Sequence, residues 1–307
     1  MIAFVFPGQG AQAVGMGKAL ADQFEICART FAEADAALDE SLSDLIFNGP
    51  MDRLTLTENT QPAILTMSIA VCRLLEERGI KPAFVAGHSL GEYSAHVAAG
   101  TLQFADAVRL VRNRGRYMQA AVPVGVGAMA AIIGLDEAGV TAACQEAAQG
   151  EVVSPANLNG AGQIVIAGTA AAVARASERA KALGAKRAIP LTVSAPFHCA
   201  LMKPAELRLT PELHAVPTAD PRIPVVANVD AEPKRTAAAS IDALIKQIAS
   251  PVRWEGVVQR LASEGVTRYV EVGPGKALSG MIKRIASGAT ILNVEGPDDL
   301  AAIEALS

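Results

Sequence analysis

A serine flanked by glycines stands where it could act as a nucleophile. Residues 87–91 read Gly-His-Ser-Leu-Gly, the G-x-S-x-G pattern, and the apolar run 83–86 before them predicts a short strand. A helix is expected from about 92 to 99, which places Ser89 on a sharp strand-to-helix turn. The free amides of that helix N-terminus could stabilise a developing oxyanion. The alternative is a glycine-rich turn in which the serine only caps the helix. The strand and helix on either side favour catalysis.

A serine hydroxyl needs a general base to attack at neutral pH, and the chain has four histidines. His88 adjoins Ser89 but is expected to point away from it. His198 follows an expected strand, in a loop where a parallel sheet presents catalytic groups. Chemistry alone ranks His198 first, ahead of His96 and His214, although a lone histidine is more often structural.

The expected helix 104–121 carries one arginine on its apolar side. At about 100° per residue, a stripe of apolar residues runs along this helix: Phe104, Ala107, Val108, Val111, Gly115 and Met118. The polar residues expected on the solvated side are Arg109, Arg112, Asn113 and Arg116. Arg114 lies beside the stripe, where an unpaired guanidinium is costly. Capture of a substrate carboxylate and a salt bridge to an internal Asp or Glu are equally compatible with that position.

The positions of the apolar runs predict how the chain is organised. Strand 2–6, helix 60–78 and the strand and helix around Ser89 favour an α/β fold with a largely parallel sheet. From 127 onward the order becomes β-α-β-β-α-β, the split βαβ or ferredoxin-like pattern. Its elements are expected at 127–134, 137–149, 151–157, 163–168, 170–183 and 186–193. We therefore expect a small subdomain, 124–193, inserted into a discontinuous larger domain made of 1–123 and 194–307.

Composition excludes several classes of protein. Of the 307 residues, 51% are hydrophobic and 19% charged, which is the balance of a globular core rather than of disorder. A net charge of -4 offers no electrostatic footprint for nucleic acid. The longest uncharged apolar stretch, 120–135, is too short for a membrane span, and no signal peptide is recognisable at the start, so a cytoplasmic protein is expected. The four cysteines form no CxxC pair, and no cluster has metal-ligand spacing, so no metal is expected.

Several motifs together resemble one enzyme family. They are Phe-Pro-Gly-Gln-Gly-Ala-Gln at 6–12, Gly-His-Ser-Leu-Gly-Glu-Tyr at 87–93, Asn-Leu-Asn at 157–159, Gln-Ile-Val-Ile-Ala-Gly at 163–168, Pro-Phe-His-Cys-Ala-Leu-Met at 196–202 and Glu-Val-Gly-Pro-Gly at 271–275. In this order, over essentially the whole chain, the sequence resembles the malonyl-CoA:acyl carrier protein transacylases of bacterial type II fatty acid synthesis.

The resemblance implies a role for particular residues. Ser89 would be the acylated nucleophile and His198 its general base, with the main-chain amides of Gln9 and Leu90 as the oxyanion hole. Arg114 would bind the malonyl carboxylate, which favours the functional reading of that arginine.

The resemblance also implies that no acid completes the triad. The main-chain carbonyl of Gln247 would hold the histidine instead. Phe197, just before the histidine, would crowd an α-methyl group and so favours malonyl over methylmalonyl units.

The resemblance implies the rest of the expected function. The fold would be an α/β-hydrolase-like large domain with a ferredoxin-like subdomain. The reaction would be a ping-pong transfer of malonyl from malonyl-CoA to the phosphopantetheine thiol of acyl carrier protein, through a malonyl-serine ester. No cofactor is expected, and the protein would be a monomer.

Three alternatives remain open at this stage. One is a trans-acting acyltransferase of polyketide synthesis with the same chemistry, another a serine hydrolase, and the third a non-catalytic module that binds carrier protein. Because carrier proteins are usually acidic, a basic patch is expected at the mouth of the site. Its candidate residues are Lys181, Lys186, Arg187, Lys203, Lys276, Lys283 and Arg284.

Overall fold

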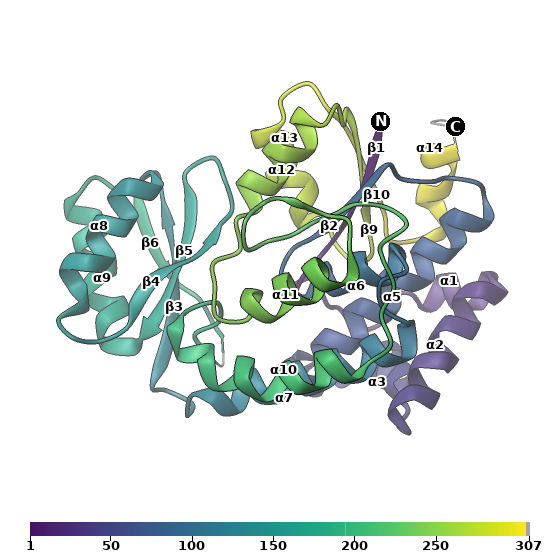
Figure 1. Cartoon of the computed structure of the whole chain (residues 1–307), viewed down its shortest axis with the longest axis horizontal. Helices are drawn as coiled ribbons and strands as arrows, with labels where there is room; N and C mark the ends of the chain where they lie inside the picture. The colour runs from purple at the N-terminus through teal and green to yellow at the C-terminus, as the bar shows by residue number, and fades with distance from the viewer. Residues whose placement is uncertain (194, 305–307) are drawn as a thin grey trace.

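A six-stranded, mostly parallel sheet forms the centre of the larger part of the molecule (Figure 1). The computed structural model describes residues 1–193 and 195–304. The strand order is β10 (Thr290–Val294), β9 (Arg268–Val272), β1 (Ile2–Phe6), β2 (Phe84–Gly87), β7 (Val225–Val226) and β8 (Pro233–Lys234). Neighbouring strands are parallel except β7 and β8.

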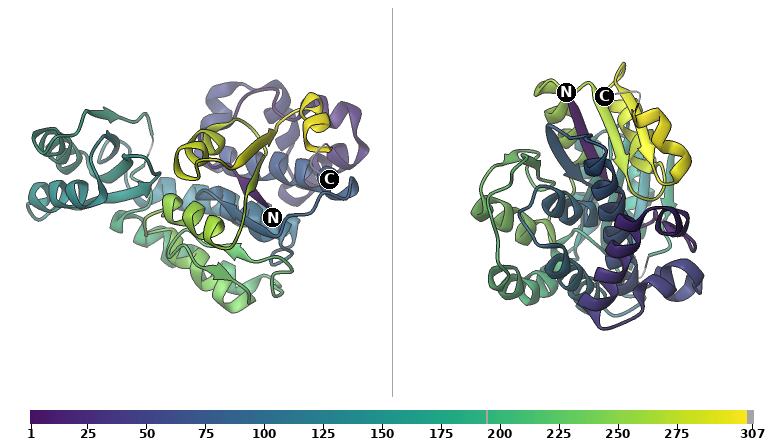
Figure 2. Two further views of the ribbon diagram at one scale, coloured as in Figure 1. Left: turned by 90° about the horizontal axis from the view of Figure 1, so that it is seen from above. Right: turned by 90° about the vertical axis from the view of Figure 1, so that its right-hand side faces the viewer.

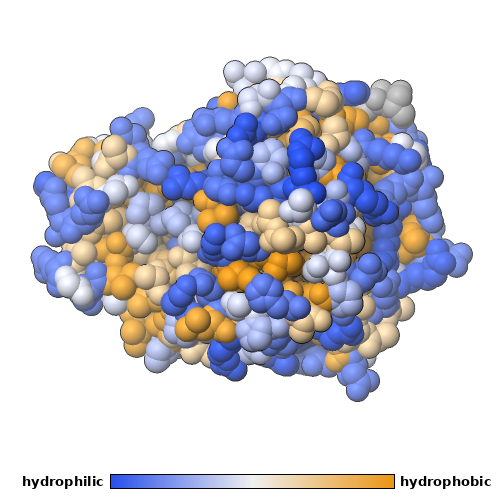
Figure 3. All heavy atoms as spheres, in the orientation of Figure 1, coloured by the Kyte–Doolittle hydropathy of each residue, from blue (hydrophilic) through white to orange (hydrophobic). Residues whose placement is uncertain are grey.

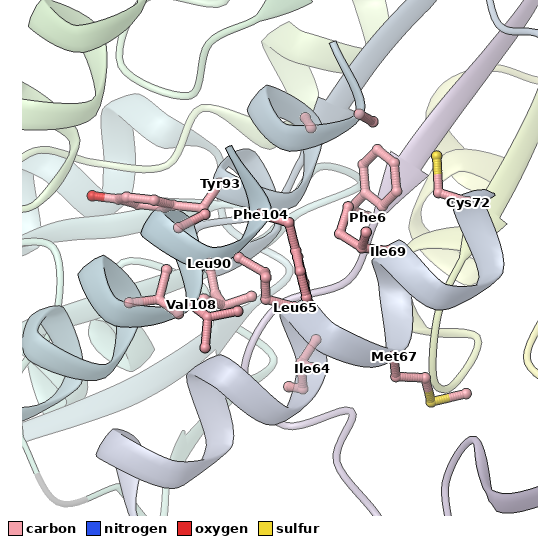
Figure 4. Close-up of a cluster of buried hydrophobic side chains, with 14 of the residues drawn as sticks. Phe6, Ile64, Leu65, Met67, Ile69, Cys72, Leu90, Tyr93, Phe104 and Val108 are labelled. Atoms are coloured by element: carbon pink, nitrogen blue, oxygen red, sulfur yellow. The ribbon is translucent and has the colours of Figure 1, made fainter. Parts of the chain in front are cut away.

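Both faces of the central strands of this sheet are buried, which explains why β1 and β2 are apolar on both sides. In β1, Phe4 and Phe6 face helices α5 (Thr57–Glu77), α6 (Leu90–Ala98) and α7 (Phe104–Ala121). Ala3 and Val5 face the opposite way, toward α12 (Trp254–Ser263) and α13 (Ala277–Ile285). Figure 4 shows side chains from α5, α6 and α7 directed toward one another in the first of these two cores. That core fixes the helices that carry the candidate site.

The remaining helices surround this framework. Near the N-terminus lie α1 (Lys18–Gln23), α2 (Glu25–Leu38), α3 (Leu42–Asn48) and α4 (Met51–Thr55). After the smaller part come the 3-10 turn η1 (Ala200–Met202), α10 (Lys203–Ala215), α11 (Ala237–Gln247), the 3-10 turn η2 (Pro297–Asp299) and α14 (Leu300–Glu304). Helices α2 and α10 pack on α7, so that α7 is covered on more than one side.

A separate four-stranded antiparallel sheet forms the smaller part, which projects from one side of the molecule (Figure 2). Its elements are β3 (Gly127–Ile133), α8 (Glu137–Ala148), β4 (Val153–Leu158), β5 (Gln163–Thr169), α9 (Ala170–Ala182) and β6 (Arg187–Pro190), and the strand order is β4-β5-β3-β6. Helices α8 and α9 cover one face of the sheet. The other face, with Met129 and Val165, packs on Phe197 and Leu201 of the larger part.

Hydrogen bonds join the two parts along one edge of the small sheet. The amide of Leu158 donates to the carbonyl of Val252 over 2.8 Å, and the amide of Val252 donates to the carbonyl of Ala156 over 2.9 Å. Through this bridge, the segment that follows α11 pairs in parallel with β4 at the edge of the small sheet. On the face shown in Figure 3, exposed hydrophobic residues gather around the middle and lower left of the molecule, whereas hydrophilic residues cover most of the right-hand side.

The expected α/β organisation with a mostly parallel sheet is confirmed, and helix 104–121 has the expected bounds. Helix α5 begins at Thr57 rather than at 60, because the Thr60 hydroxyl and the Asn59 amide bond the carbonyls of Leu54 and Arg53 and secure an earlier turn. Strand β6 ends at Pro190 rather than at 193: the Leu191 amide still donates to the carbonyl of Met129 in β3, but the Val193 amide turns back to the carbonyl of Leu191. The boundary expected at 194 lies outside the described residues, as do 305–307. No helix among the described residues is long and apolar enough to cross a membrane.

Replacing Gly91 by alanine tests the close packing between β1 and α6. A Cβ at this position would lie 2.0 Å from the main-chain oxygen of Phe6, which cannot move away without disturbing the central strand. We expect Gly91→Ala to lower the free energy of unfolding by more than about 3 kcal/mol in denaturant titrations. Gly280→Ala is the control, because nothing lies within 4 Å of its added Cβ in α13. A Gly91→Ala protein as stable as this control would contradict the packing described.

Candidate active site

The turn at Ser89 holds its backbone in an unusual conformation. Strand β2 ends at Gly87 and α6 begins at Leu90, with Ser89 between them at φ 53° and ψ -106°. Such a conformation costs of order 1–3 kcal/mol for a residue with a side chain and persists only where its surroundings enforce it. The fully buried Asn228 does so, because its Oδ1 accepts from the Ser89 amide over 2.7 Å and its Nδ2 donates to the Gly87 carbonyl over 2.7 Å. The serine therefore stands on the sharp turn that the sequence predicts.

The structure brings Ser89, His198 and Gln247 together. The Ser89 Oγ lies 2.6 Å from His198 Nε2, and His198 Nδ1 lies 3.0 Å from the main-chain oxygen of Gln247. A carbonyl oxygen only accepts, so Nδ1 carries the ring proton and Nε2 presents its lone pair to the serine hydroxyl. The arrangement can deprotonate the serine without a carboxylate.

Burial keeps His198 in its neutral form. Desolvation is the largest cause and the nearby charge of Arg114 the next, and together they lower the pKa of His198 to about 3. The imidazole therefore stays unprotonated, as a general base must be, throughout the neutral range.

Arg114 reaches the same hydroxyl from α7 with only 1% of its surface exposed. Its Nη2 donates to Ser89 Oγ over 3.1 Å and to Gln247 Oε1 over 2.9 Å, and its Nη1 donates to Gln61 Oε1 over 2.8 Å. The guanidinium also lies 5.3 Å from the ring centre of Tyr93. Among the described residues no carboxylate forms a salt bridge with it. Of the two interpretations of Arg114 that the sequence allowed, the salt bridge to an internal Asp or Glu is therefore not found among the described residues.

The expectation that Arg112 lies on the solvated side of α7 is wrong. Its side chain is buried, donating from Nη1 to Asn59 Oδ1 over 2.5 Å and from Nη2 to Glu40 Oε2 over 2.8 Å. The helical projection describes α7 alone, whereas residues before and within α5 cover this side and supply both partners. Arg109 and Arg116 are exposed as expected, and Asn113 is half-buried.

The other histidines take no part in this arrangement. The His88 ring directs Nε2 to Asn159 Oδ1 over 3.0 Å and packs against Trp254, as expected of a residue pointing away from the serine. His96 is fully buried within α6, and burial lowers its pKa to about 3. His214 lies in the last turn of α10.

A cavity of about 320 Å³ opens in front of the serine, between the two parts of the molecule. Ser89, Arg114 and His198 line it, together with Phe197 and, from the small sheet, Met129. Within the two described ranges, no cluster of three His, Cys, Asp or Glu side chains could hold a metal ion.

The two amides expected to form an oxyanion hole also border this cavity. Gln9 and Leu90 line it, and in the described part of the chain their main-chain amides donate to no backbone carbonyl. The Gln9 side chain donates to Thr57 Oγ1 over 3.2 Å, which holds the loop that follows β1. Both amides are thus free to donate to an oxyanion bound in the cavity.

Sequence reasoning missed four contributors to the site: Gln61, Glu92, Asn228 and the side chain of Gln247. Asn228 follows β7 at the carboxyl end of the parallel sheet, where such residues are expected, but a two-residue strand leaves no readable pattern. Glu92 belongs to the motif around Ser89, yet only the fold shows what its carboxylate contacts.

The chain is similar to known proteins over nearly its full length. Residues 3–290 match the family model described as acyl transferase domain. The chain is 53% identical over 301 residues to the malonyl CoA-acyl carrier protein transacylase of Escherichia coli K12, covering 98% of this chain and 97% of that protein.

Two solved structures are similar over nearly their full length. One is an acyl carrier protein S-malonyltransferase from Vibrio cholerae, with a TM-score of 0.97, 49% identity, and 98% of this chain and 99% of that chain covered. The other is a malonyl-transacylase in complex with its type II PKS acyl-carrier protein, with a TM-score of 0.97, 46% identity, and 100% of this chain and 99% of that chain covered.

The low pKa of His198 predicts an unusual pH profile for the reaction of Ser89 with a fluorophosphonate. Because the imidazole stays neutral as the pH falls, we expect the labelling rate to stay constant from about pH 8 to about pH 5. His198→Ala, which lacks the base, should label slowly at every pH. A tenfold decline per pH unit below about 6.5, the behaviour of an ordinary histidine, would contradict the assignment.

Proposed function

The chain belongs to the acyl transferase family, among the malonyl CoA-acyl carrier protein transacylases, and from this premise we propose that it transfers malonyl from malonyl-CoA to the phosphopantetheine thiol of an acyl carrier protein. The family resemblance of its motifs is confirmed by the near-full-length matches. The observation that carries the proposal is the buried Arg114, which lies 3.1 Å from the serine hydroxyl with no carboxylate of its own among the described residues. A guanidinium so placed suits an acyl group that ends in a carboxylate.

In the first half-reaction, Ser89 Oγ attacks the thioester carbonyl while its proton passes to His198 Nε2, 2.6 Å away. The tetrahedral oxyanion accepts hydrogen bonds from the main-chain amides of Gln9 and Leu90. The carbon–sulfur bond then breaks, and the CoA thiolate leaves with the proton that His198 returns. A malonyl ester remains on Ser89.

In the second half-reaction, the carrier thiol is the nucleophile. His198 takes the thiol proton, sulfur attacks the ester carbonyl, and the proton goes to Ser89 Oγ as the ester bond breaks. The Gln247 carbonyl holds the imidazole in the required tautomer through both half-reactions. Arg114 retains the malonyl carboxylate throughout, which keeps the ester carbonyl beside the oxyanion amides.

Phe197 is proposed to limit the acyl group at its α-carbon. Its side chain lines the cavity and packs between the two parts of the molecule, next to the base His198. An α-methyl group there would meet the aromatic ring, so malonyl is preferred to methylmalonyl.

We further propose that an acidic carrier protein docks at the mouth of the cavity. Lys283 follows the cavity-lining part of α13, Lys186 directly precedes β6, and Arg187 is the first residue of that strand. Among the described residues none of these three pairs with a carboxylate. Lys181, Lys203 and Lys276 are ion-paired with Glu178, Glu206 and Glu295, and Arg284 donates to Gln163. Unpaired cations attract an acidic partner more strongly, so the first three are the better candidates.

We further propose that residues 1–123 together with 194–307 form an α/β-hydrolase-like domain and that residues 124–193 form a ferredoxin-like subdomain. The strand order β4-β5-β3-β6 supports the ferredoxin-like subdomain. We also propose a cytoplasmic monomer that uses no cofactor beyond its CoA thioester substrate. The transferred malonyl groups are proposed to supply extender units for fatty acid synthesis, and a structural neighbour with a type II PKS carrier keeps polyketide synthesis as the alternative.

Incubation with malonyl-CoA alone tests the covalent intermediate. Intact mass measurement should find one malonyl adduct on the wild-type protein, because no thiol is present to remove it, and none on Ser89→Ala. Free malonate released without an adduct would identify a hydrolase instead. If neither an adduct nor free malonate forms, the remaining interpretation is a non-catalytic protein that binds carrier protein.

Arg114→Ala tests how the acyl group is recognised. Loss of a charge-assisted bidentate contact should slow malonyl transfer by about a hundredfold, whereas acetyl transfer, which lacks the carboxylate, should gain relative to it. Arg109→Ala is the matched control, since Arg109 lies on the same helix with half of its side chain exposed. Equal losses of malonyl and acetyl transfer in Arg114→Ala would contradict a carboxylate-binding role.

A further inference from the structure

Helix α7 carries two buried arginines that are held in opposite ways. Arg112 pairs with the carboxylate of Glu40 and with the amide oxygen of Asn59. Arg114 is held by three neutral oxygens, those of Gln61, Gln247 and the Ser89 hydroxyl. The charge of Arg112 is thus neutralised by its direct partner, and that of Arg114 is not.

The nearest carboxylate to Arg114 along this network is one carboxamide away. Gln247 is fully buried, and its Oε1 accepts from Arg114 Nη2 over 2.9 Å. Its Nε2 donates over 2.8 Å to Oε2 of Glu92, which is also fully buried, and over 2.9 Å to the main-chain oxygen of Ser89. A neutral amide therefore separates the buried guanidinium from the buried carboxyl group of Glu92, whose pKa desolvation raises to about 7.

Glu92 determines which way that amide faces. The two acceptors, Glu92 Oε2 and the Ser89 carbonyl, take both hydrogens of Gln247 Nε2, so Oε1 must face the guanidinium. The opposite orientation would set amide hydrogens against those of Arg114. Glu92 Oε2 also accepts from the main-chain amide of Asn228 over 3.0 Å, which anchors the carboxylate to the residue that supports the serine turn.

We propose that Glu92 and the side chain of Gln247 are positioning residues for the selection of a carboxylate-bearing acyl group. Gln247 fixes Arg114 through a neutral oxygen, and Glu92 fixes the amide that provides it. A carboxylate directly against Arg114 would compete with the acyl carboxylate, and in a buried site that competition is strong. The inference rests on the proposed function, because it explains how Arg114 is held in place and still keeps its charge for malonyl.

The direct test moves the carboxylate one residue closer to Arg114. The double variant Glu92→Gln/Gln247→Glu keeps the net charge and nearly every atom but places the anion on the guanidinium. Intact mass measurement would follow the rates at which malonyl-CoA and acetyl-CoA acylate Ser89. We expect the malonyl-to-acetyl rate ratio to fall at least about tenfold, and the ratio cancels any general loss of activity. An unchanged ratio in the folded double variant would overturn the proposal.

A second pair of variants tests Glu92 alone. Glu92→Ala removes the acceptor that orients Gln247 and should lower the ratio about fivefold or more. Glu92→Gln can keep an oxygen at the Oε2 position, so it should restore the ratio to within about twofold of wild type. Equal ratios in Glu92→Ala and wild type would show that Glu92 does not position the amide.

A further variant tests the same claim if the variants at Gln247 do not fold. Gln61→Glu puts a carboxylate on the other side of the guanidinium, at Nη1, and should lower the ratio in the same way. A wild-type ratio in this variant would overturn the claim that neutral oxygens keep the charge available. A wild-type protein that forms no malonyl ester would refute the proposed function itself, whereas a selective wild type with equally selective variants would refute only this inference.

Discussion

A full positive charge at the base of the cavity is the feature around which this structure is organised. Arg114 has only 1% of its surface exposed, and burying an ion costs several kcal/mol unless its surroundings replace water. Three neighbouring helices supply the replacement: Gln61 comes from α5, Tyr93 from α6 and Gln247 from α11. None of these contacts cancels the charge. The protein thus maintains a cation that a ligand with a carboxylate can complete.

The same residues connect acyl binding to the chemistry at Ser89. Gln247 contacts Arg114 through its side chain and His198 through its main-chain oxygen. Asn228 holds the serine turn and donates its amide to the carboxylate that orients Gln247. A displacement of α11 would therefore disturb the base and the carboxylate-binding arginine together. The cavity in front of them lies between two hydrogen-bonded parts, which limits access of water to an ester formed there.

Short stretches of the sequence were sufficient to predict the turn at Ser89, the bounds of α7 and the inward position of Arg114. The turn at Ser89 follows from glycines that no larger residue can replace, and the bounds of α7 follow from its apolar spacing. The inward position of Arg114 follows from the same spacing. These predictions needed no knowledge of the rest of the chain.

What the sequence could not predict depends on contacts between distant segments. Arg112 was placed on the solvated face because its partner Glu40 lies 72 residues earlier in the chain. Asn228 follows a strand of only two residues, and the Gln247 side chain acquires its role from Glu92, 155 residues away. A helical projection contains none of these partners, so it cannot distinguish a neutralised arginine from an available one.

The most direct measurement is the selectivity of the unmodified protein. Single-turnover acylation of wild-type Ser89 by malonyl-CoA and by acetyl-CoA gives two second-order rate constants under one set of conditions. If the charge of Arg114 is available to the acyl group, the malonyl constant should exceed the acetyl constant by about a hundredfold or more. Comparable rate constants would mean that the buried guanidinium does not recognise the carboxylate of the acyl group, and the central claim would fail.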